Sequence, residues 1–322
     1  MKFEFRLNGR DWLGLYITAF AVYAGHFAAN QMLIHANGIQ PGTVNPSNFG
    51  LAFLLTIIAT IAGLFLYAPI LRIFLANTRL GEDPFSYTGT TIGFVLRYIG
   101  YTVLSIITLG VYGPWAMKNM IKYVAENIQY RQNKLSFEGD GFSLFLIGLV
   151  ALILPLFVVC IVFAMTIKST GTNTFLKLPL FMLFYLAIIP FAYFAMKWMY
   201  NIRYNQYQIR WNTEAIPAIV KILQEVFLSI ITLGIYAPAA HVRLYAYFVD
   251  KTKITGDDGT SYTLKTSLNT FEAWKTIWIQ CLLTIITVGI YGAWAYCKMI
   301  ALYANSTSIE RVYGVSPSDR TI

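Results

Sequence analysis

One eight-residue phrase occurs three times along the chain, each time between two apolar runs. The copies are Thr108–Trp115 (TLGVYGPW), Thr232–Ala239 (TLGIYAPA) and Thr287–Trp294 (TVGIYGAW). Glycine adopts backbone angles that other residues avoid, and proline favours the first turn of a helix. The phrase therefore predicts a tight corner between two helices. Its recurrence predicts a chain built from related helical hairpins.

The runs around these corners are too apolar for an ordinary soluble domain. The 322 residues are 57% hydrophobic and 12% charged, whereas soluble domains carry about 25% charged residues. A helix that crosses a hydrocarbon core needs about 20 apolar residues. The segments long enough to do so are Trp12 to Ile34, Phe49 to Leu75, Phe142 to Ile167 and Pro179 to Tyr207. The composition therefore predicts a multi-pass membrane protein.

Short segments with alternating polarity precede each pair of apolar runs, a pattern typical of strands. They lie at 3–7, 85–88, 135–138, 208–212 and 262–265. An isolated short strand leaves backbone donors unpaired, so these strands are expected to meet in a small sheet. The predicted fold is mainly α: a polytopic membrane bundle of about ten helices with a small cytoplasmic β-sheet. It forms a single membrane domain, 1–322, of five strand-helix-helix pseudo-repeats at 1–82, 83–132, 133–206, 207–258 and 259–307, followed by a cytoplasmic tail at 308–322.

Basic residues collect at the ends of the predicted strands. Two helices in each repeat return the chain to its starting side, so all five strands face one compartment. Under the positive-inside rule that compartment is the cytoplasm, and both termini are cytoplasmic. The same bias accounts for the formal net charge of +9 without a nucleic-acid partner. The basic residues on the strand side are Lys2, Arg6, Arg10, Arg79, Arg131, Lys134, Arg210, Lys251, Lys253 and Lys265, and those on the opposite side are Lys168 and Lys177.

The corner phrase, together with the segment Phe137–Gly141 (FEGDG) ahead of an apolar run, resembles the YjgN-like family of bacterial inner-membrane proteins. That family is a domain of unknown function. The resemblance covers most of the chain and implies an inner-membrane location and a repeat architecture, but no activity. The chain departs from the pattern at Ala239, where the corner has tryptophan, and at Ala293, where it has proline.

Charged side chains within the apolar runs mark the candidate site, because charges are costly in a membrane and often functional there. Glu225 lies nine residues before Gly234. At 1.5 Å per residue this is roughly 13 Å from the corner, near the middle of a ~30 Å core. Lys221 lies one turn earlier on the same helix face. Alignment of the corners places Arg97 opposite Lys221, and Gln280 opposite Glu225.

The second helices carry polar groups at one matched position. Asn119, Arg243 and Lys298 each lie five residues after the start of their helix, and related helices are expected to bring them toward a common interior. One interpretation is a polar pathway or anion site, with Glu225 as proton or cation partner. The alternative is an internal network of ion pairs that joins helices. The candidate intramembrane site comprises Glu225, Lys221, Arg97, Arg243, Lys298 and Gln280.

Motifs of catalysis are absent from the sequence. It has no phosphate-binding loop, no HExxH and no GxSxG, so we expect no enzyme activity, catalytic residue, metal site or cofactor. The corner tyrosines, Tyr112, Tyr236 and Tyr291, are expected to anchor hairpins at the membrane interface. The predicted function is transport or sensing of a small solute or ion through the polar intramembrane site. The alternative is a structural or assembly protein whose sheet recruits a protein partner by strand addition.

Overall fold

A single antiparallel sheet of ten strands organises the molecule. The computed structural model describes residues 1–36, 46–170 and 174–312. Within them, the spatial order of the strands equals their order in the chain. The strands are β1 (Phe3–Phe5), β2 (Thr78–Leu80), β3 (Asp83–Tyr87), β4 (Ile128–Tyr130), β5 (Asn133–Phe137), β6 (Ile202–Tyr204), β7 (Tyr207–Trp211), β8 (Thr252–Gly256), β9 (Ser261–Thr266) and β10 (Thr307–Val312).

The last strand returns to the first. Lys2 forms a bridge with Ser308, and the terminal amine of Met1 donates to the carbonyl of Ile309 at 2.8 Å. The amide of Ile309 donates back to the carbonyl of Met1 at 2.7 Å. The sheet is therefore a nearly closed antiparallel barrel, which leaves few unpaired edge groups.

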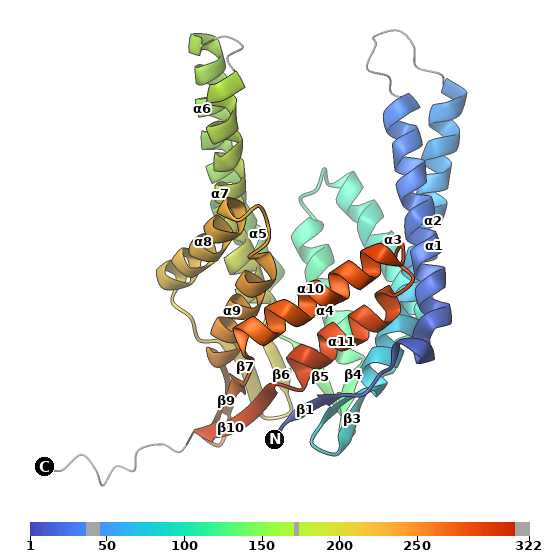
Figure 1. Ribbon diagram of the computed structural model, residues 1–322, viewed down its shortest axis with the longest axis vertical. Coiled ribbons are helices and arrows are strands. Elements are labelled where there is room, and N and C mark those ends of the chain that lie inside the picture. The colour runs from blue at the N-terminus through green and yellow to red at the C-terminus, as the bar shows by residue number, and fades with distance from the viewer. Residues whose placement is uncertain (37–45, 171–173, 313–322) are drawn as a thin grey trace, which may run out of the picture.

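The helices stand as pairs on one side of this sheet (Figure 1). Apart from α5 and α6, each helix contacts the next one along the chain, and α11 contacts α1, so the pairs form a ring above the strands. A π-helical turn at Leu149–Ile153 joins α5 to α6. The helices are α1 (Gly9–Ala36), α2 (Pro46–Ala76), α3 (Thr91–Ile107), α4 (Gly113–Glu126), α5 (Gly141–Gly148), α6 (Leu154–Thr170), α7 (Thr174–Met199), α8 (Ala215–Ile231), α9 (Ala237–Asp250), α10 (Thr270–Ile286) and α11 (Gly292–Ala304).

The predicted fold class, a polytopic helical bundle with a small sheet, is wrong. The sheet has ten strands, and its last strand returns to its first. Of the helices in the described ranges, three have both the length and the hydropathy of a membrane span. They cover Gly9–Ile34, Phe49–Ala76 and Gly141–Thr166. The chain is thus a ring of helical hairpins on a nearly closed sheet, and the shorter hairpins do not meet the criteria for spanning.

The error arose because the strand that follows each pair of helices was not recognised in the sequence. The five predicted strands correspond to β1, β3, β5, β7 and β9. Each intervening strand follows closely after a helix, and three of these strands have only three residues. Their two-residue turns are Gly81–Glu82, Arg131–Gln132 and Asn205–Gln206. None has the Asn-Gly or Asp-Gly signal of a hairpin, although Arg131, Gln132 and Asn205 all adopt positive φ.

Some predictions fall on segments that the structure does not describe. They include the side chains of Lys168 and Lys177, and residues 313–322 of the predicted tail. Residues 308–312, which the prediction placed in that tail, belong to β10. The pseudo-repeat boundaries stay a prediction.

The hairpins have two heights. α1, α2 and α7 contain 28, 31 and 26 residues, so each is about 40 Å long at 1.5 Å per residue. α3, α8 and α10 contain 17 residues each, or about 25 Å. The corners of the three short hairpins consequently end well below the tips of the two tall pairs (Figure 1).

A packed core joins the two ends of the ring. It contains Phe5, Leu7, Trp12, Tyr16, Ala293 and Cys297, which come from β1, α1, α11 and the segment between β1 and α1. The indole of Trp12 donates to the carbonyl of Ala293 at 3.1 Å. Closure therefore rests on buried side chains as well as on the strand contacts.

Tyr87, on β3, buries a hydroxyl without a partner. Its side chain is 4% exposed, and its hydroxyl bonds to nothing in the described part of the chain. Burial raises the pKa of Tyr87 to about 12, because the phenolate would lose its hydration. A buried unpaired hydroxyl costs about 1–3 kcal/mol. Tyr87→Phe is therefore expected to raise the free energy of unfolding by about 1 kcal/mol, measured by thermal unfolding in detergent.

Tyr130 supplies the matched control for that prediction. It is also buried, but its hydroxyl donates to the carbonyl of Leu80 at 2.9 Å. Tyr130→Phe leaves that carbonyl without this donor and should lower the free energy of unfolding by about 1 kcal/mol. Equal losses in both variants would contradict the assignment of Tyr87 as unsatisfied.

Candidate functional site

Glu225 on α8 is a buried carboxylate surrounded by donors. It is 1% exposed. Lys221, one turn earlier, donates to Oε1 at 2.6 Å, and the hydroxyl of Tyr236 donates to Oε2 at 2.8 Å. Arg243 on α9 places Nε 3.5 Å from Oε1 and donates from its guanidinium to the Tyr236 hydroxyl at 2.7 Å. Two cations and a phenol therefore compensate one buried charge.

The α10–α11 hairpin repeats this arrangement with a neutral amide in place of the carboxylate, and the α3–α4 hairpin keeps only part of it. The hydroxyl of Tyr291 donates to Oε1 of the buried Gln280 at 3.0 Å, and Lys298 donates to the same hydroxyl at 2.9 Å. In the α3–α4 hairpin, the amide of Asn119 donates to the hydroxyl of Tyr112 at 3.3 Å. In the α8–α9 and α10–α11 hairpins, the corner tyrosine therefore links a side chain of the first helix to a side chain of the second helix.

The role of the corner tyrosines was missed in the sequence. They were expected to anchor hairpins at the interface, yet Tyr112, Tyr236 and Tyr291 each bond to a polar side chain seven residues later. Seven residues are two helical turns, so the two side chains lie on one helix face. The seven-residue spacing is the feature of the sequence from which these hydrogen bonds could have been predicted.

The structure does not gather the six candidate residues into one site. Glu225, Lys221 and Arg243 form one cluster, which we call the Glu225 cluster. Gln280 and Lys298 meet at Tyr291 in a different hairpin. Arg97 stands apart on α3, where its guanidinium lies 4.3 Å from the centre of the Tyr123 ring and donates to the carbonyl of Gly93 at 3.0 Å.

A hollow of about 500 Å³ borders the Glu225 cluster between α8 and α9. Its walls include Glu225, Ser229 and His241. The Nδ1 atom of His241 lies 2.6 Å from the hydroxyl of Tyr303, so this imidazole has a partner. Across the described residues, no group of three or more His, Cys, Asp or Glu side chains is arranged to hold a metal ion.

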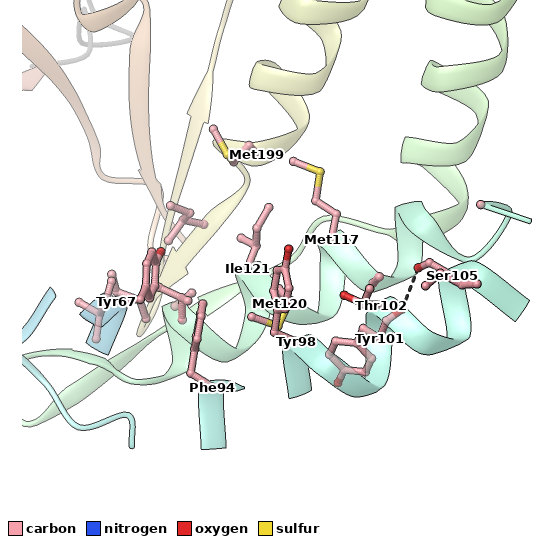
Figure 2. A pocket seen from close by; sticks show the side chains of 18 of the residues that line it. Tyr67, Phe94, Tyr98, Tyr101, Thr102, Ser105, Met117, Met120, Ile121 and Met199 are labelled. Carbon is pink, nitrogen blue, oxygen red and sulfur yellow. Dashed lines mark hydrogen bonds between the residues drawn. The ribbon is translucent and has the colours of Figure 1, made fainter. Parts of the chain in front are cut away.

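A second pocket lies between α3 and α4 (Figure 2). This α3–α4 pocket has a volume of about 890 Å³. Tyr67 of α2 and Met199 of α7 close its sides, and residues of β4, β5 and β6 form its base. Its apolar lining includes Phe94, Ile106, Leu109, Met117, Met120, Ile121, Val124, Ile128, Leu135 and Ile202.

Few polar groups face this pocket. Tyr98, Tyr101 and Thr102 bring hydroxyls to the wall along α3 (Figure 2). Within the described residues, the hydroxyls of Tyr98 and Tyr101 have no protein hydrogen-bond partner. Met117 and Met120 are flexible thioethers that adapt to differently shaped ligands. Sequence patterns did not predict this pocket, because its walls come from seven different elements: α2, α3, α4, β4, β5, α7 and β6.

These features define a class: helical hairpins on a nearly closed sheet, with three apolar helices compatible with association with a membrane. Residues 2–274 match the sequence pattern of a family described as bacterial protein of unknown function (DUF898). The chain belongs to this family, which includes the YjgN-like proteins that its corners resemble. No curated protein and no solved structure matches the chain.

Proposed function

We propose that this chain is a multi-pass protein of the bacterial inner membrane that binds an amphipathic small molecule in the α3–α4 pocket, as the first step in sensing or transporting it. The observation that carries this proposal is the pocket itself, at about 890 Å³ and almost wholly apolar. Ligand sites are typically concave, about 300–1,000 Å³, and mostly apolar with a few convergent polar groups.

The membrane setting is supported by the surface of the tall helices. Phe53 and Ile58 of α2 and Phe157 of α6 are large apolar side chains exposed on candidate spans. Basic residues mark the sheet side, since Arg79, Arg131 and Lys253 lie on or beside strands. The positive-inside rule therefore favours cytoplasmic strands and cytoplasmic termini.

The lining of the α3–α4 pocket indicates the class of ligand. No lysine, arginine, aspartate or glutamate lines it, so a charged head group is expected to stay outside. The apolar wall suits an acyl chain, and the hydroxyls of Tyr98 and Tyr101 suit a carbonyl or hydroxyl on the ligand. A fatty acid or a lipid with one inserted chain fits this description.

Filling the pocket is the test of this proposal. Met120→Trp adds bulk inside the cavity and is expected to weaken binding of a fluorescent polyene fatty acid, cis-parinaric acid, at least tenfold. A tenfold change corresponds to about 1.4 kcal/mol. The control is Ile99→Trp, because Ile99 lies on α3 but is an exposed residue outside the lining. Fluorescence titration in detergent measures both variants, and equal affinities would refute the pocket as the site.

A second candidate function rests on the hollow beside Glu225. A buried carboxylate next to a cavity suits a site for a proton or a small cation. If the Glu225 cluster carries protons across the membrane, Glu225→Gln is expected to abolish proton transport while the fold is retained. A pH-sensitive dye inside proteoliposomes measures this transport. A variant that loses only thermal stability would identify the cluster as a network that joins α8 to α9.

The assembly alternative also stays a proposal. Strand addition needs a free sheet edge. β1 and β10 contact each other through Lys2 and Ser308, and residues Glu310–Val312 extend past that contact. A partner strand would therefore have to pair with this short stretch.

A further inference from the structure

The three short hairpins present the same exposed apolar tips. Leu109, Leu233 and Val288 are 94%, 92% and 81% exposed. The sequence around them carries no charged residue over 98–117, 226–240 and 276–297. Their exposed apolar neighbours are Ile106, Ile107, Val111, Ile230, Ile231, Ile235, Ile285, Ile286 and Ile290. Apolar patches of this kind mark a contact with another apolar phase.

The residue at each tip is an unfavourable choice for a corner in water. Leu109, Leu233 and Val288 have φ of 50°, 51° and 50°. This left-handed region suits glycine or asparagine, and a β-branched residue such as valine is rare there. Three bulky aliphatic side chains in strained positions indicate surroundings in which an apolar side chain is favoured over a polar one.

The backbone of each corner is also suited to a site without water. From Thr108 to Gly113, every N–H donates to a group within the same hairpin. The Thr108 hydroxyl accepts from the amide of Tyr112 at 3.0 Å. Thr232 and Thr287 cap their corners in the same way. Backbone groups in hydrocarbon must find partners inside the protein, because no water is there to bind them.

One tip can be placed against a spanning helix. The ring of Phe20 on α1 lies beside Gly289, and the hydroxyl of Tyr16 donates to the carbonyl of Gly289 at 2.6 Å. Phe20 is eleven residues beyond Gly9, where the span begins, or about 16 Å along the helix. That distance is about half of a ~30 Å hydrocarbon core.

We infer that the hairpins α3–α4, α8–α9 and α10–α11 enter the bilayer from the sheet side and turn back near its midplane, with Leu109, Leu233 and Val288 among phospholipid acyl chains. The two tall pairs cross the bilayer completely. This placement rests on the proposed membrane setting. Leu109 also lines the α3–α4 pocket, so Leu233 and Val288 are the tips that test the placement independently of a ligand there.

Site-directed spin labelling tests the depth of the tips. The variants Leu109→Cys, Leu233→Cys and Val288→Cys are made singly in a chain whose native cysteines are replaced by alanine, and are placed in phospholipid nanodiscs. Power saturation with oxygen and with a water-soluble nickel chelate then reports the surroundings of each label. We expect oxygen to relax all three tip labels at least fivefold more effectively than nickel. The native cysteines are Cys160, Cys281 and Cys297.

Two control labels separate this inference from the proposed membrane setting. Ile58→Cys lies on the exposed surface of α2 and should be in lipid, and Ser86→Cys lies on an exposed position of β3 and should contact nickel. Tip labels that favour nickel, or that neither reagent reaches, overturn the inference if Ile58→Cys remains in lipid. A label at Ile58 that favours nickel overturns the membrane setting itself.

A second set of labels covers the case in which a tip variant does not fold. Ile106, Ile230 and Ile285 lie three residues before the tips, within helices, and are also exposed. Labels at these positions should be slightly shallower than the tips and still favour oxygen. Preference for nickel there would overturn the inference equally.

Discussion

The double variant Lys221→Ala, Arg243→Ala is expected to lose about 3 kcal/mol of unfolding free energy, because Glu225 then stays buried without a cation. In the native chain its Oε1 lies 2.6 Å from the ammonium of Lys221 and 3.5 Å from the guanidinium of Arg243. Removal of one partner from a buried pair typically costs about 3–5 kcal/mol. The lower end applies here, because Lys221 and Arg243 are themselves partly exposed.

Addition of Glu225→Gln to that double variant should restore part of the loss. The amide has no charge that needs compensation, and its oxygen still accepts from Tyr236. Thermal and chemical unfolding in detergent measure the series. Lys298→Ala is the matched control, since Lys298 occupies the position of Arg243 in the α10–α11 hairpin but bonds to a tyrosine beside the neutral Gln280. It should lose about 1 kcal/mol.

Comparison of the unfolding free energies of the double variant, the triple variant and Lys298→Ala shows how the Glu225 cluster stabilises the fold. A double variant no less stable than Lys298→Ala would show that the buried carboxylate does not depend on its cations. A triple variant less stable than the double would show that the carboxylate stabilises the hairpin through Tyr236 alone.

Local chemistry explains what the sequence could predict. The Thr-x-Gly-x-Tyr corners follow from residues that are adjacent in the chain, and Gly110 and Gly234 adopt φ of 87° and 85°. The contact between Lys221 and Glu225 follows from their i, i+4 spacing. The strands β1, β3, β5, β7 and β9 follow from alternation over four or five residues.

Sequence patterns could not predict closure of the ring, because closure depends on contacts between residues that are far apart in the chain. β10 meets β1 through Lys2 and Ser308, and α11 packs on α1 through Trp12 and Ala293. The three-residue strands carry too few positions for a period of two to be recognised. The common interior expected for Asn119, Arg243 and Lys298 required a bundle, and the ring holds these three side chains in separate hairpins instead.

The same ring explains why the α3–α4 pocket and the Glu225 cluster are separate. Each hairpin packs mainly on its two neighbours in the chain, so polar groups at matched depths are satisfied within their own hairpin. In the α3–α4 hairpin, Tyr101 and Asn119 occupy the positions of Glu225 and Arg243, so neither position carries an ionised group. This hairpin has fewer polar contacts between its helices, and it lines the α3–α4 pocket.

Gly292→Ala is expected to lose about 2–3 kcal/mol of unfolding free energy, by overpacking the seam that closes the ring. A Cβ atom at Gly292 would overlap the hydroxyl of Tyr16. That hydroxyl is held by its bond to the carbonyl of Gly289, and Tyr16 is buried in the core that joins α1 to α11. Relief therefore requires either loss of this bond or movement of one helix.

Gly113→Ala provides the matched control, because Gly113 occupies the same position in the first corner. A Cβ atom there would meet nothing within 4 Å, and the middle corner already carries Ala237 at this position. Since alanine restricts the unfolded chain more than glycine, Gly113→Ala should gain about 0.4–1 kcal/mol. Addition of Tyr16→Phe to Gly292→Ala removes the overlapping oxygen and should recover part of the loss. Opposite signs for the two glycine variants are the expected result, and equal unfolding midpoints would show that α1 and α11 do not meet as the closed ring requires.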